Sequence, residues 1–255
     1  MTPYEIVAIC LSSIAILIPF IQWAWKKWIC KAKLNYYPTG QAYLFFNHSG
    51  SYLRIDGVYE ALKKPIAVKN IDLHIRRQKD DQKLNLTWSS FISPVSQTIA
   101  GNFSQTTEYA HPFRIEADSI TCAFIEFGDK FDSSGKIIAK QLEILAQKIK
   151  PSIESGKDYE TVLKEYRALP EFATAKTVLE KEFYWEIGKY DVDMEVRYGK
   201  MTVHFHCQIV VDEMQNTKLK QNIEESLISP IKDIYHIPRN YQNIRIEVVE
   251  RHDKK

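Results

Sequence analysis

Two imidazoles and two carboxylates on one predicted β-hairpin are the residues best suited to chemistry. Segment 189–211 alternates polar and apolar side chains, as strands do. When the segment is folded at its centre, Glu195 lies opposite His204 and Asp193 lies opposite His206. Such a set could hold a divalent metal ion or serve acid–base catalysis. The same pairs also form ordinary cross-strand ion pairs, each worth about 0.2–1 kcal/mol. We therefore expect no catalytic residue and treat the four side chains only as an alternative metal site.

The turn of this hairpin determines which side chains face the core. A two-residue turn beginning at Gly199 places glycine where a positive φ is needed. Val196 then faces Val203, and Met194 faces Phe205, so these apolar pairs are predicted to be buried.

Other signatures of catalysis are missing from the sequence. It contains no G-x-S-x-G, no H-E-x-x-H and no paired-cysteine zinc spacing. The glycine-containing segment 128–136 has the wrong spacing for a phosphate loop. We expect no cofactor and favour a non-enzymatic protein.

Charge argues against a nucleic-acid partner. The chain has 34 basic and 32 acidic residues, a net charge of +2. Residues 1–33 hold four lysines and one glutamate, or +3, which leaves the remaining chain at about −1. Because phosphate binding needs concentrated Lys and Arg, a near-neutral body does not fit that role.

An uncharged apolar run at residues 6–21 predicts a membrane anchor in residues 1–33. Extended to residue 25, it has the length that a helix needs to cross the hydrocarbon core. The lysines that follow predict an N-terminus outside and a cytoplasmic C-terminal domain, with the protein in the inner cell membrane and the lipid bilayer as a partner. The predicted membrane-interface residues are Tyr4, Trp23, Trp25, Lys26, Lys27, Trp28, Lys31 and Lys33.

The rest of the chain, residues 34–255, is predicted to be one cytoplasmic domain of the α+β class, mainly β. A first β region at 34–130 precedes a helical insertion at 135–183. A late β-hairpin, a helix and a final strand fill 184–255. We predict an antiparallel β-sandwich-like domain, and two separate domains are the alternative.

Four details of this domain are open to a structural test. Residues 34–40 are predicted to be a linker, and a bulge is expected at Lys69 and Asn70. Segments 111–117 and 120–127 are predicted to pair as a hairpin, with Cys122 in the core.

Three hypotheses of function follow. The first is a membrane-anchored module that binds a ligand or protein through the polar segment 93–110 and the helical insertion. The second is a membrane effector activated when its transmembrane helices cluster, since Ser12, Ser13 and Ala15 would allow close packing. The third is a metal-dependent enzyme that uses the hairpin residues. The expected partners are therefore another protein or further copies of the chain.

Overall fold

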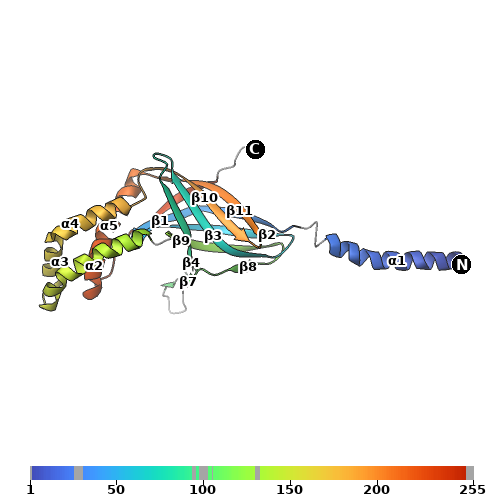
Figure 1. The fold of residues 1–255 in the computed structure, drawn as a ribbon, viewed down its shortest axis with the longest axis horizontal. Coiled ribbons are helices and arrows are strands. Elements are labelled where there is room, and N and C mark those ends of the chain that lie inside the picture. Colours follow the sequence, from blue (N-terminus) through green and yellow to red (C-terminus); the bar gives the residue numbers. More distant parts are fainter. Residues whose placement is uncertain are drawn as a thin grey trace.

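A β-barrel forms the centre of the molecule, with helices at both ends (Figure 1). The computed structural model describes residues 2–25, 31–93, 96–97, 103–104, 106–129 and 133–250. The helices are α1 (Pro3–Ala24), α2 (Ser133–Glu154), α3 (Tyr159–Ala168), α4 (Pro170–Glu182) and α5 (Glu213–Ile234). The strands are β1 (Lys33–Asn47), β2 (Gly50–Leu62), β3 (Ile66–Arg77), β4 (Lys83–Ile92), β5 (Ser96–Gln97), β6 (Phe103–Ser104), β7 (Thr107–Tyr109), β8 (Phe113–Ile115), β9 (Ser119–Asp129), β10 (Gly188–Tyr198), β11 (Met201–Val211) and β12 (Ile244–Glu250).

Eight antiparallel strands form a closed ring. Their order is β4-β9-β2-β1-β12-β11-β10-β3, and the pairing of β3 with β4 closes it. The short strands β7 and β8 add to β4 and β3, while β5 and β6 pair only with each other. The predicted β-sandwich is therefore wrong. Strand β12 lies between β1 and β11, and β10 pairs with β3, so the early and late β regions share one barrel.

Alternation along each strand fills the barrel with apolar side chains. On β10 the inward side chains are all buried, and the residues between them are more exposed. This is the period of two expected of a strand with one face in the core. The inward side chains of β10 are Tyr190, Val192, Met194, Val196 and Tyr198.

Helix α1 projects from one end of the barrel (Figure 1). No helix in the described part of the chain combines the length and the apolarity needed to cross a membrane. The predicted single-pass transmembrane helix is therefore wrong. That prediction treated residues 6–21 as one apolar run, although Ser12, Ser13 and Pro19 lie within it.

The remaining helices form an arm at the opposite end, where α5 contacts β1 and β12 and α2 contacts β2 (Figure 1). The segment before β10 joins this arm to the barrel. Trp185, which is fully buried, donates a hydrogen bond from Nε1 to the Phe45 carbonyl on β1 at 3.1 Å. Asn216 on α5 donates to the Trp185 carbonyl at 2.7 Å, and the Tyr184 hydroxyl donates to the Gln82 carbonyl at 2.8 Å. Barrel and arm thus share one set of buried contacts.

The predicted bulge on β3 is confirmed. Asn70 lies opposite Arg197, but Val68 lies opposite Tyr198, which leaves Lys69 as the extra residue. Such an insertion bends the strand and increases its twist, as closure of a barrel requires.

Three local predictions are wrong. Residues 34–40 are part of β1 rather than a linker. Strand β8 pairs with β3 instead of β9. Cys122 is exposed, because Ala123, Ile125 and Phe127 are the inward residues of β9.

Candidate functional site

The hairpin of β10 and β11 has the register that the sequence predicts. Glu195 lies opposite His204, and Asp193 lies opposite His206. Gly199 begins the turn with φ of 56°, a conformation that glycine adopts without strain. The four polar side chains therefore share the outer wall of the barrel, and the apolar residues between them face inward.

Both imidazoles of β11 contact the carboxylate of Asp193. His204 Nδ1 lies 3.0 Å from Asp193 Oδ2, and His206 Nδ1 lies 3.3 Å from Asp193 Oδ1. The two rings are stacked, with centroids 6.3 Å apart and planes 14° apart. Asp193 is therefore the shared acceptor of this group, although Glu195 is the residue directly opposite His204.

A third histidine, His74 on β3, completes this surface. Asp193 pairs with His74 in the β10–β3 ladder. His74 Nε2 lies 3.4 Å from Glu195 Oε2, and its Nδ1 lies 2.8 Å from Asn85 Oδ1. The alternation of residues along β3 indicates that His74 faces outward. No nearby residue indicates that β3 and β10 pair.

A buried carboxylate anchors the other side of the network. Asp72 is 1% exposed and accepts hydrogen bonds from Arg197 Nη2 and Thr87 Oγ1, each at 2.6 Å. Arg197 Nε also donates to Glu195 Oε1 at 2.6 Å, and this hydrogen bond lowers the pKa of Glu195. One guanidinium thus neutralises two carboxylates, one of them buried.

A hollow of about 680 Å³ lies over these strands. Within the described ranges, no three His, Cys, Asp or Glu side chains are arranged to hold a metal ion. The imidazoles, carboxylates and guanidiniums contact one another. They therefore form a network of paired charges on the outer face of β4, β3, β10 and β11. The hollow is lined by His74, Ile75, Arg76, Lys83, Asn85, Asp191, Val192, Asp193, His206 and Cys207.

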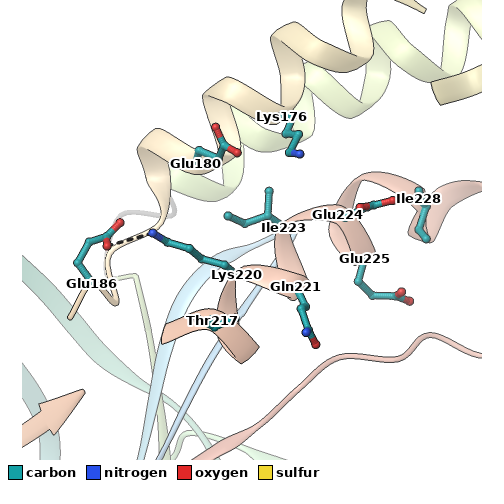
Figure 2. Close-up of a pocket in the computed structure, with 10 residues that line it drawn as sticks. All are labelled: Lys176, Glu180, Glu186, Thr217, Lys220, Gln221, Ile223, Glu224, Glu225 and Ile228. Carbon is teal, nitrogen blue, oxygen red and sulfur yellow. Dashed lines mark hydrogen bonds and ion pairs between the residues drawn. The ribbon is translucent and has the colours of Figure 1, made fainter. Parts of the chain in front are cut away.

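A second hollow, of about 580 Å³, is lined by residues of α4 and α5 (Figure 2). Ile223 and Ile228 on α5 are buried and give the groove an apolar floor. Polar and charged side chains from both helices surround that floor. The groove is lined by Lys176, Glu180, Glu186, Thr217, Lys220, Gln221, Ile223, Glu224, Glu225 and Ile228.

Most charges around the groove are paired within the chain. Lys220 Nζ lies 3.1 Å from Glu186 Oε2, the contact drawn as a dashed line in Figure 2. Glu224 pairs with Arg167 at 2.6 Å. Glu225 pairs with Lys232 at 2.7 Å, and both of these side chains are largely buried.

Two rim charges differ from the rest. Lys176 and Glu180 lie on α4, and both are exposed. In the described structure neither side chain makes a hydrogen bond or an ion pair, and Lys176 points toward the groove in Figure 2. Residues four apart on a helix lie on one face. The rim of α4 therefore offers one positive and one negative charge, a helical turn apart. No sequence motif marks this groove.

The predicted membrane-interface residues lie on or after α1. Tyr4, Trp23 and Trp25 are exposed, as are Lys31 and Lys33. Residues 26–30, which include Lys26, Lys27 and Trp28, lie outside the described residues, as does much of the polar segment 93–110. The structure thus brings the histidine and carboxylate candidates together, whereas Tyr4 and Trp23 lie on α1 and Lys33 is the first residue of β1.

Comparison with known proteins identifies no family. No protein-family model matches the chain, and no curated protein sequence matches it. Among solved structures, the chain is similar to the sporulation control protein Spo0M from Bacillus subtilis at 11% identity, over 77% of this chain and 54% of that one, with a TM-score of 0.28. It is similar to a family 123 glycoside hydrolase from Clostridium perfringens at 10% identity, over 69% of this chain and 26% of that one, with a TM-score of 0.28. The chain spans about half the length of the first protein and about a quarter of the second. Similarity at this level supports no conclusion about fold or function.

Proposed function

We propose that the chain is a non-enzymatic binding module, which takes an amphipathic helix of a partner protein in the groove between α4 and α5. The observation that carries this proposal is the pair of exposed, unpaired charges on α4, Lys176 and Glu180, beside a buried apolar floor.

The shape of the groove supports a helical occupant. Two helices border it, and a third helix can pack against both by placing its apolar ridge between them. Its volume of about 580 Å³ is within the usual range of binding pockets, about 300–1,000 Å³. The apolar residues of the partner would lie over Ile223 and Ile228, which the chain itself already largely buries.

The charges support a particular pattern on the partner. An acidic residue of the partner would pair with Lys176, and a basic residue one helical turn away would pair with Glu180. The other charged residues of the rim already have partners in the chain, so they contribute little to selectivity. Charges at the rim of an interface generally determine which partner binds more than how tightly it binds.

The barrel wall supports the non-enzymatic part of the proposal. A catalytic base needs a nitrogen or oxygen that can reach a substrate proton. His74, His204 and Asp193 are instead in contact with other side chains of the same wall. The wall is better suited to stabilising the barrel than to proton transfer.

A displayed library of amphipathic helices tests the proposed function. Helices are selected on the full chain and then measured against the charge-reversed variant Lys176→Glu/Glu180→Lys. Each exposed ion pair is worth about 0.2–1 kcal/mol, so losing two of them should weaken binding by about twofold to thirtyfold. A helix with its own two charges exchanged should restore binding to the variant.

A matched control reverses a pair away from the groove. Arg114 and Glu116 form an exposed ion pair at 2.9 Å on and beside β8. The variant Arg114→Glu/Glu116→Arg should bind the selected helices like the unaltered chain. If the two variants bind equally, or if no helix is enriched, the groove is not the binding site.

A further inference from the structure

Helix α1 carries an apolar stripe at a regular spacing. Tyr4, Leu11, Ile14, Ile18, Ile21 and Trp25 follow one another at intervals of seven, three, four, three and four residues. These are the a and d positions of a heptad, the pattern by which helices pack against one another in coiled coils. We refer to these six residues as the α1 stripe.

The six residues of the α1 stripe are exposed. Its six side chains are between 49% and 88% exposed. Helix α1 lies apart from the barrel and from the helical arm in Figure 1. From Leu11 to Trp25 the α1 stripe is an exposed apolar surface, and such a surface indicates a site of association.

We infer that α1 binds further copies of itself, and that more than two copies of the chain assemble through the α1 stripe. A heptad seam is complementary to a second copy of the same seam. Residues 11–25 contain no charged side chain, so identical helices can approach in register without like-charge repulsion. This inference does not depend on the groove between α4 and α5.

The size of the helix favours more than two copies. Its 22 residues give a length of about 33 Å, and one face of a helix about 10 Å wide therefore covers roughly 350 Å². A two-helix contact would bury about 700 Å², less than the roughly 1,000 Å² that a specific interface usually needs. Four helices, each packed against two neighbours, would bury about 2,800 Å².

Residue types lead to the same stoichiometry. Leu11 and Ile18 occupy a positions, and Ile14 and Ile21 occupy d positions. Isoleucine at d disfavours two-stranded coiled coils and favours three or four strands. Leu17, which is also exposed, adjoins the α1 stripe and widens it, as a multi-helix bundle requires.

Sedimentation equilibrium of the full chain in detergent-free buffer tests the inference. The unaltered chain should sediment as one species of three or four copies at micromolar concentration. Ile18→Glu places an unpaired carboxylate in the seam, so it should raise the dissociation constant about a hundredfold or more and give monomers. Ile16→Glu is the matched control, because Ile16 is 74% exposed on the same helix but lies off the α1 stripe.

Four results would overturn the inference: a monomeric or dimeric unaltered chain, a broad distribution of masses, equal effects of the two glutamate variants, or a monomer that binds phosphatidylcholine vesicles through α1. Circular dichroism of both variants checks that the barrel and the arm remain folded. Because α1 and the arm lie at opposite ends of the barrel (Figure 1), a loss of assembly with intact β signal reports on α1.

Discussion

Replacing Trp185 tests whether the helical arm and the barrel are one cooperative unit. Trp185 is fully buried, and its ring centroid lies 5.3 Å from that of Tyr184 and 5.7 Å from that of Tyr190. Its Nε1 donates to the Phe45 carbonyl of β1, and its own carbonyl accepts from Asn216 of α5. The Trp185 side chain therefore contacts the barrel and the two neighbouring tyrosine rings, and the Trp185 main-chain carbonyl contacts the arm.

The expected cost of Trp185→Ala follows from these contacts. Truncating a buried tryptophan to alanine usually costs about 3–5 kcal/mol, a value that already includes the cavity and the lost ring contacts. Domains are stable by about 5–15 kcal/mol, so this one change removes a large share of the free energy of unfolding. Trp185→Phe keeps most of the ring but loses the N–H donor to Phe45. It should cost about 1–2 kcal/mol.

Urea unfolding at 25 °C measures both variants against the unaltered chain. Far-ultraviolet circular dichroism follows the helices and strands together, and tryptophan fluorescence follows the loss of buried rings. If arm and barrel unfold as one unit, both signals shift to lower urea by the same amount. A cost below 1 kcal/mol for Trp185→Ala, or a helix transition separate from the strand transition, would refute the proposed coupling. If Trp185→Ala does not fold, Trp185→Phe still supplies the measurement.

Three further predictions follow from local geometry. In Gly57→Ala the new Cβ would clash with the ring of Tyr36, so we expect the free energy of unfolding in urea to fall by about 1–3 kcal/mol, a loss that Tyr36→Ala should largely relieve. Asp212→Ala removes the capping box of α5 and should cost about 1 kcal/mol, while Asp212→Asn should cost less; equal costs would contradict the cap. A hydrogen bond from Arg77 lowers the pKa of Asp80 to about 2. The ion pair therefore stabilises the fold above about pH 4, and this stabilisation is lost as the pH falls toward 2. Asp80→Asn should flatten the fall in melting temperature over that range, and an unchanged profile would count against this pair.

The local parts of the fold could be read from the sequence. The hairpin of β10 and β11 needed only alternation and a turn beginning at Gly199, and its register is the predicted one. The bulge at Lys69 was visible as a break in alternation. Strand β9 shows the limit of this approach. It has apolar residues on both faces, so Cys122 and Phe124 could be assigned to the core as readily as Ala123 and Ile125.

The closed barrel could not be read in this way. Closure depends on pairings such as β10 with β3 and β1 with β12, which join residues more than 100 positions apart. No turn or periodicity encodes these partners, so the late hairpin was assigned to a sandwich. For the same reason the sequence does not show that His74 lies opposite Asp193 in the barrel. The membrane prediction failed differently, because it relied on the length of an apolar run and gave little weight to Ser12, Ser13 and Pro19.

The two proposed binding surfaces lie at opposite ends of the barrel, which gives their combination a definite consequence (Figure 1). Assembly through α1 would leave the groove between α4 and α5 open on every copy. Several linked grooves bind a multivalent partner with an effective concentration that can raise avidity 10²–10⁴-fold above the affinity of one groove. Ile18→Glu should therefore abolish this gain while leaving the affinity for a single helix unchanged. Lys176→Glu/Glu180→Lys should weaken single-helix binding without changing the sedimenting mass. Each variant thus alters one measurement and serves as the control for the other. If both variants changed both measurements, groove and stripe would not be independent.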